Sequence, residues 1–330
     1  QFCLLDHQLL AIGLLLIGTH KGVARQGASC AVHLAAEGGL IDTRPMALAS
    51  LGELAGWRGS HAVTDSLAAT VIAAYAQNGW QPDTLYAHVL SWRGMALGAL
   101  GRREEALAFH EEALTLVKRW EPEGGRLYSN LLNNLAVFHA GNDEHAKAEP
   151  YMREAIEIDR RIYGPDHPQF AIAYNNLASI IHYQGRRAEA EPVYREALAI
   201  SQRAYGPDHP NVAQFVENIA TLLADLDRFE EAETFYRDAL RILTVALEPG
   251  DTRLALLRRN LALNRHALGD YAEAEVLLRS ALGTFETSLG DDHFYTAIAR
   301  SSLGRTLTAA GRAREGLALL RASLASMEAQ

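Results

Sequence analysis

The chain has 330 residues and 48% of them are hydrophobic, so it can bury a substantial core and is not a disordered tail. Its net charge of −9 argues against a nucleic-acid partner, because neutralising phosphates requires a basic surface. Only three of the 31 basic residues are lysines, and this bias toward arginine suggests a GC-rich bacterial genome.

Residues 1–42 form a segment without assigned structure. Both cysteines, Cys3 and Cys30, lie in it, so no disulfide framework or cysteine-rich zinc site supports the remaining chain. The apolar run 9–18 is shorter than the roughly 20 residues that span a bilayer, so we expect no membrane span. Its length would suit a signal peptide, but Asp6 stands where basic residues are expected. We therefore expect a cytoplasmic protein whose segment is a buried helix or a truncation, with export as the alternative.

From residue 43 onward the sequence repeats itself every 42 residues. The hexapeptide Tyr163–Pro168 recurs word for word as Tyr205–Pro210. The same offset connects three further series: Asn134, Asn176, Asn218 and Asn260; Ala106, Ala148, Ala190, Ala232 and Ala274; and Ala113, Ala155, Ala197, Ala239 and Ala281. Such periodicity is the mark of a repeat architecture. We predict about seven repeats: 43–84, which is degenerate, 85–126, 127–168, 169–210, 211–252, 253–294 and 295–330.

Each repeat is predicted to be a helical hairpin. In 169–210 the apolar residues between Ala173 and Ile181 fall on one arc of a helix, and those between Ala190 and Ile200 on one arc of a second. Gly185 breaks the chain between them, and the Gly-Pro-Asp-His-Pro loop ends the second helix. One hairpin cannot bury its apolar face alone, whereas stacked hairpins bury a continuous one. The predicted fold class is therefore all-α, a solenoid of helix-turn-helix repeats.

At these residues the sequence resembles the tetratricopeptide repeat family. Ala178, the Ala190/Tyr194 pair and Ala197 correspond to its hairpin signature. The 42-residue period, Asn-Asn-Leu-Ala at 133–136 and 175–178, and the hexapeptide resemble the longer repeats of kinesin light chains. The resemblance is strong over 85–330 and weak over 43–84. It implies a right-handed superhelix whose groove, lined by the first helix of each repeat, binds peptide segments of partner proteins.

Helix geometry supplies the residues of this groove. They lie on the arc of each first helix that is opposite to its apolar arc, and they are rich in carboxamides, which can pair with a peptide backbone. The predicted groove residues are Trp92, Asn130, Asn133, Asn134, Asn175, Asn176, Ser179, His182, Gln214, Glu217, Asn218, Arg259, Asn260, His266 and Arg305. For the repeated asparagines a second interpretation stays open: they could instead bond to a neighbouring helix and fix the stacking angle.

We found no motif for catalysis, a cofactor or a metal. The sequence has no Gly-rich phosphate loop, nucleophile elbow or His-Glu-x-x-His helix. His167 and His209 recur with the repeat, which indicates a role in forming the loop. We therefore expect no catalytic residues, no cofactor and no metal site.

Three functions are compatible with such an array. The first is a non-enzymatic scaffold that binds a peptide segment of a partner. The second, suggested by a start at Gln1 that is typical of a fragment, is the sensor arm of a larger signalling ATPase or protease. The third is a clamp for a carboxylate-ended tail. It ranks last because, as the family implies, such clamps rely on paired lysines and arginines, and the predicted lining lacks lysine.

Overall fold

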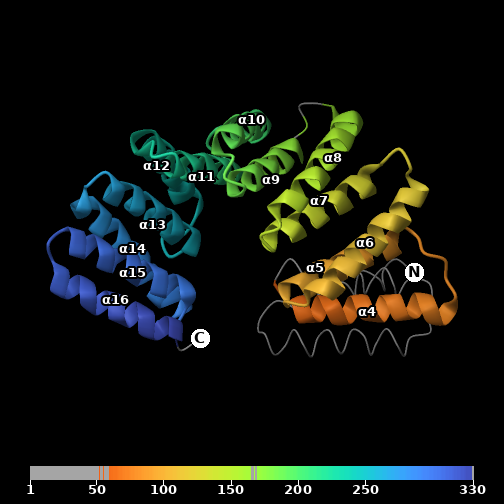
Figure 1. Ribbon diagram of the computed structural model, residues 1–330, viewed down its shortest axis with the longest axis horizontal. Helices are drawn as coiled ribbons and strands as arrows, with labels where there is room; N and C mark the ends of the chain where they lie inside the picture. Colours follow the sequence, from red (N-terminus) through yellow and green to blue (C-terminus); the bar gives the residue numbers. More distant parts are fainter. Residues whose placement is uncertain (1–51, 53–54, 56–58, 165–166, 168, 329–330) are drawn as a thin grey trace, which may run out of the picture. The chain divides into compact units, whose positions relative to one another are not determined.

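The computed structural model describes residues 52, 55, 59–164, 167 and 169–328 (Figure 1). The predicted segment 1–42, with its apolar run, lies outside them. Every described element is an α-helix: α4 (His61–Asn78), α5 (Thr84–Ala99), α6 (Arg103–Trp120), α7 (Arg126–Gly141), α8 (His145–Tyr163), α9 (Gln169–Tyr183), α10 (Arg187–Tyr205), α11 (Pro210–Asp225), α12 (Phe229–Ala246), α13 (Thr252–Ala267), α14 (Tyr271–Leu289), α15 (Phe294–Ala309) and α16 (Ala313–Glu328). The predicted all-α fold of helical hairpins is confirmed.

The odd-numbered helices, from α5 to α15, are the first helices of the hairpins and are called A helices below. The even-numbered helices are the second, or B, helices. The chain divides into two units, Gln1–Gly164 and Pro165–Gln330, and each is described by itself. In both units an A helix packs against its own B helix, and that B helix packs against the next A helix.

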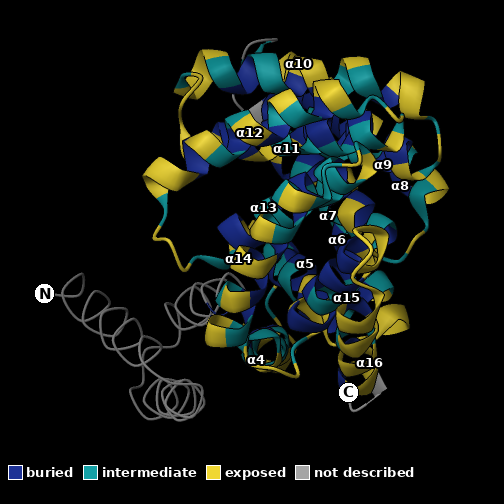
Figure 2. Ribbon diagram, turned by 90° about the vertical axis from the view of Figure 1, so that its left-hand side faces the viewer, coloured by how far each residue is buried: buried dark blue, intermediate teal, exposed yellow. Residues whose placement is uncertain are grey.

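The core runs between the helices as a row of small and large apolar side chains. Ala178 on α9 and Ala190 on α10 are fully buried, as are their equivalents Ala262 and Ala274. Phe285, also fully buried, packs with the latter pair, and burying a side chain of this size contributes about 1.5–3 kcal/mol. Figure 2 shows the buried residues on helix faces that meet other helices and the exposed ones on the opposite faces.

Two backbone positions explain the recurrent glycines. Each A helix is followed by a residue in the left-handed region, such as Gly185 with a φ of 81°, and in two repeats Asp143 and Asp227 take this place. The second residue of each hexapeptide, directly after a B helix, is a glycine such as Gly206, whose φ of 87° and ψ of 154° are essentially restricted to glycine. The predicted helix break at Gly185 is confirmed.

The histidine of the second hexapeptide, His209, is a helix cap. The Nδ1 atom of His209 accepts a hydrogen bond of 3.1 Å from the backbone N–H of Asn211, in the first turn of α11. His293 does the same for α15, and Asp251 takes over this role at α13. These bonds satisfy N–H groups that have no partner inside a helix. The loop-forming role predicted for His209 is therefore a capping role.

An arginine–glutamate pattern joins successive B helices. Arg228, directly before α12, pairs with Glu231 at 2.6 Å and with Glu191 of the preceding B helix at 2.7 Å. Arg312 repeats this arrangement with Glu315, and with Glu275 at 2.7 Å. These side chains are partly exposed, so each pair stabilises the fold only weakly.

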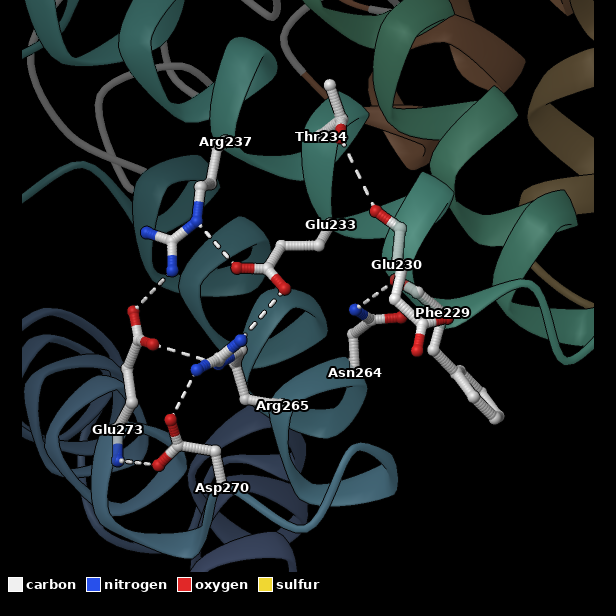
Figure 3. A network of polar contacts seen from close by, with 9 residues as sticks. All are labelled: Phe229, Glu230, Glu233, Thr234, Arg237, Asn264, Arg265, Asp270 and Glu273. Carbon is white, nitrogen blue, oxygen red and sulfur yellow. Dashed lines mark hydrogen bonds and ion pairs between the residues drawn. The ribbon is translucent and has the colours of Figure 1, made fainter.

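In one repeat a different arginine connects the successive B helices (Figure 3). The position equivalent to Arg228 and Arg312 is Asp270, which cannot pair with glutamates. Arg265, at the end of α13, replaces the missing cation. It pairs with Glu233 and Glu273 at 2.8 Å each and also with Asp270. A single guanidinium thereby connects α12, α13 and α14.

Candidate functional site

All fifteen predicted groove residues lie on A helices, as expected. Trp92, on α5, and Asn130, Asn133 and Asn134, on α7, belong to the first unit; the other eleven belong to the second, on α9, α11, α13 and α15. Neighbouring A helices within a unit are in contact, as α5 is with α7 and α13 with α15. We call the face that carries these residues the A-helix surface of each unit.

Three of the four repeated asparagines bond to the preceding A helix. Asn218 donates its side-chain N–H to Oδ1 of Asn175 at 2.7 Å, and Asn260 donates to Oε1 of Glu217 at 3.0 Å. In the first unit Asn134 donates to Oγ of Ser91 at 3.0 Å. Each of these bonds spans 43 residues of sequence. For these three asparagines the structure thus provides the neighbouring-helix bond of the second interpretation, and any ligand contact would come in addition.

A second set of bonds holds two A helices, α9 and α11, to their own B helices. The hydroxyl groups of Ser179 and Tyr194 are 2.9 Å apart, and those of Thr221 and Tyr236 are 3.2 Å apart one repeat later. Burial raises the pKa of both tyrosines to about 12, so they are neutral at physiological pH. The hydroxyl of Ser179 therefore fixes the hairpin as well as facing the A-helix surface.

Two predicted histidines connect neighbouring A helices. Nε2 of His182 lies 2.9 Å from a carboxylate oxygen of Asp225, and Nδ1 of His266 lies 3.0 Å from Oγ1 of Thr306. His182 is only 5% exposed and Asn175 only 7%. His182 and Asn175 thus lie beneath the A-helix surface, and a ligand would contact their more exposed neighbours first.

The predicted residues that a ligand can reach are the exposed and half-buried ones. Gln214 and Arg305 are exposed, and Trp92, Asn130, Asn133, Asn176 and Arg259 are among the half-buried ones. In the first unit the ring of Trp92 stacks on that of His88, with centroids 5.6 Å apart. The surface of this unit is thus aromatic at α5 and amide-rich at α7.

The second unit contains two ionisable groups that are partly withdrawn from water. Burial raises the pKa of Glu217, and the hydrogen bond from Asn260 opposes this shift. Burial lowers the pKa of Arg259, and the nearby charge of Arg305 lowers it further. Both groups lie on the A-helix surface, so its chemistry in this unit is polar and charged.

Sequence reasoning missed the residues that complete these bonds. Thr306 and Tyr236 were not among the predicted site residues, although each bonds to an A-helix residue of the surface. Tyr236 could have been found, because tyrosine recurs 42 residues apart at 194 and 236. The partner of His266 has no such signal.

The described part of the chain offers no cluster of three or more histidine, cysteine or acidic side chains that could hold a metal ion. In the same part, no helix has both the length and the apolar character needed to cross a bilayer.

Comparison with known families identifies the repeats. A family model described as tetratricopeptide repeat matches residues 127–178, 169–244 and 251–329, and a second model of the same description matches 93–119. Together these matches cover more than half of the chain. No curated protein matches the sequence.

Three solved structures illustrate the fold. The quorum sensor NprR of B. thuringiensis, in its apo form, is 15% identical with a TM-score of 0.72, over 99% of this chain and 88% of that one. A kinesin light chain-like protein of P. anserina is 20% identical with a TM-score of 0.53, over 60% and 95%. A signal-transduction ATPase of Pyrococcus horikoshii with a tetratricopeptide repeat sensor is 14% identical with a TM-score of 0.66, over 98% and 46%. At these identities the likeness concerns the fold.

Proposed function

Because the chain belongs to the tetratricopeptide repeat family, we propose that it is a non-enzymatic scaffold that binds a peptide segment of a partner protein. The binding sites are the A-helix surfaces. The observation that carries this proposal is that adjacent A helices present polar side chains at equivalent positions. Some of these side chains are exposed or half-buried, and their carboxamides offer donors and acceptors that suit a peptide backbone.

Within the fifteen predicted residues, ligand contacts should concentrate on the exposed and half-buried members. Three of these residues can contact a ligand without breaking any helix–helix hydrogen bond seen in the described structure. They are Asn130 and Asn133 on α7 and Gln214 on α11. Asn175 and His182 would act indirectly, by holding the surface in shape. The acidic balance of the chain supports a protein rather than a nucleic-acid partner.

The proposal can be tested by selecting peptides from a random dodecapeptide library on the whole immobilised chain. We expect enriched peptides whose binding weakens at least tenfold when Asn130 and Asn133, or Gln214, are replaced by alanine. Arg119→Ala, an exposed change at the end of α6, serves as control and should leave binding unchanged. Absence of enrichment, or binding that depends on Arg119 instead, would contradict the proposal.

A second candidate function is the sensor arm of a larger signalling ATPase. It is favoured by the likeness to the ATPase from P. horikoshii, of which this chain spans 46%. The complete reading frame decides between the two: an adjoining nucleotide-binding domain would support the second candidate, and an array alone would remove it.

A further inference from the structure

Arg259 on α13 is a half-buried cation to which the described residues supply no counterion. Within the described chain it forms no ion pair, and its Nε atom is buried without a hydrogen-bond acceptor. One of its terminal nitrogens is 3.4 Å from Oδ1 of its neighbour Asn260, which is a long contact. Arg265, six positions later on the same helix, pairs with three carboxylates. The guanidinium of Arg259 therefore has donors available that the fold does not use.

Arg305 on α15 is a second cation on the same A-helix surface as Arg259. It is exposed and has no ion pair in the part of the chain that the structure describes. Burial is the main cause that lowers the pKa of Arg259 and of His266, and the charge of Arg305 lowers both further. The Arg305 guanidinium therefore lies near both groups. The 3.0 Å contact between His266 and Thr306, the residue after Arg305, holds α13 and α15 together at this point.

Glu217, an acidic residue of the A-helix surface, is bonded to another group, and in the described part of the chain it forms no ion pair with Arg259 or Arg305. Glu217 on α11 accepts the side-chain N–H of Asn260 at 3.0 Å. In the part of the chain that the structure describes, these two arginines of the A-helix surface thus have no ion-pair partner, although the net charge of the chain is −9. An unpaired, partly buried charge is unfavourable, and a ligand carboxylate that entered would remove this penalty.

We propose that Arg259 and Arg305 together bind the side-chain carboxylate of an aspartate or glutamate in the bound peptide. This inference rests on the proposed function and specifies its ligand: a peptide with one acidic residue placed opposite α13 and α15. The planar guanidinium groups can each offer two parallel N–H donors to one carboxylate, which gives orientation as well as affinity.

The test uses the whole chain and peptides enriched from the random dodecapeptide library. For an enriched peptide that contains Glu or Asp, affinity is measured by fluorescence anisotropy for the original peptide, its Gln or Asn analogue and its C-terminally amidated form. We expect the Gln or Asn analogue to bind the unaltered chain at least tenfold more weakly, and amidation to have no effect. With Arg259→Met or Arg305→Met, the acidic peptide and its analogue should bind equally. Arg321→Met, an exposed change on α16, is the matched control and should behave as the unaltered chain.

The outcomes separate this inference from the proposed function. If peptides bind but enriched sequences lack acidic residues, or acid and amide forms bind equally to the unaltered chain, the arginine pair is not the site and the scaffold function stands. A loss of binding on amidation alone would assign the site to a chain end and overturn the inference, as would selective binding of phosphoserine peptides. If no peptide is enriched, both proposals fail. Arg305→Met tests the inference even if Arg259→Met does not fold, because Arg305 is exposed.

Discussion

Asn218 donates a hydrogen bond of 2.7 Å to Oδ1 of Asn175, 43 residues earlier, and thereby joins α11 to α9. The acceptor residue is only 7% exposed, so water cannot easily replace the donor. The equivalent bond from Asn260 to Glu217 joins α13 to α11. A repeated asparagine in this family of hairpins can thus be a structural connection between repeats even where it borders a binding surface.

The first prediction concerns this connection. Asn218→Ala should lower the free energy of unfolding by about 1–3 kcal/mol, because it leaves a buried acceptor on Asn175 without its donor. Urea unfolding followed by circular dichroism measures the effect. Gln214→Ala, on an exposed position of the same helix, should change stability by less than about 0.5 kcal/mol. Equal midpoints for the two variants would show that the bond contributes nothing.

The second prediction concerns pH. His110 is 2% exposed, its two ring nitrogens have no hydrogen-bond partner among the described residues, and burial, with a smaller effect of His139, lowers its pKa to about 4. Between pH 4 and 6.5 the unfolded chain therefore binds a proton at His110 that the folded chain does not. Stability should fall as the pH decreases through this window, by up to about 3 kcal/mol from this group.

His110→Met isolates the contribution, because the equivalent position of the next repeat is Met152, which is fully buried. The difference in urea midpoint between variant and unaltered chain should grow from pH 7 to pH 4, while the other titrating groups act on both proteins. A constant difference across this range would refute the assignment.

The third prediction concerns the last hairpin, in which Gly304 and Gly316 replace the alanines of the other repeats. A Cβ atom added to Gly316 would lie 2.5 Å from the backbone oxygen of Gly304, so Gly316→Ala should destabilise by about 1–3 kcal/mol. Gly283→Ala, in the middle of α14 with no atom near the new methyl group, should instead stabilise by about 0.5–1 kcal/mol. Thermal unfolding of both variants gives the two signs; the same sign for both would contradict the packing argument.

The fourth prediction concerns the cation shared by three helices. Arg265→Met should lower the thermal midpoint at low ionic strength, because Glu233, Asp270 and Glu273 would then repel one another. Added salt screens such repulsion, so the difference should shrink in 1 M NaCl. Arg279→Met, which removes one exposed pair with Glu275, is the control and should have a smaller effect. An effect of Arg265→Met that is independent of salt would point to lost packing.

The sequence predicted the hairpins well because helix ends and close approaches demand specific residues. The positive φ at Gly185 and the fully buried Ala178 and Ala190 leave signals that repeat every 42 residues. The capping atom could not be foreseen in the same way. Aspartate is the better known cap, yet in the hexapeptide loop His209, one residue after Asp208, directs its ring nitrogen at the helix.

The role of the asparagines also stayed open for a physical reason. Their acceptors, Ser91, Asn175 and Glu217, differ in residue type from repeat to repeat, so no pattern in one sequence marks them as partners. Which residue lies opposite depends on how neighbouring helices are placed side by side. The same holds for Arg265, whose three acidic partners lie on α12, at the start of α14 and within it.

The bonds donated by Asn134, Asn218 and Asn260 each reach back by 43 residues, so one whole repeat of the second unit can be removed without leaving an asparagine amide unpaired. Excision of residues 211–252 would remove Glu217 and bring Asn260 opposite Asn175, which already accepts an asparagine amide. The bond between Thr221 and Tyr236 lies within the excised module and would leave with it. Deletion of this one repeat from the gene would therefore shorten the A-helix surface of the second unit and preserve the hydrogen bond between its neighbouring A helices.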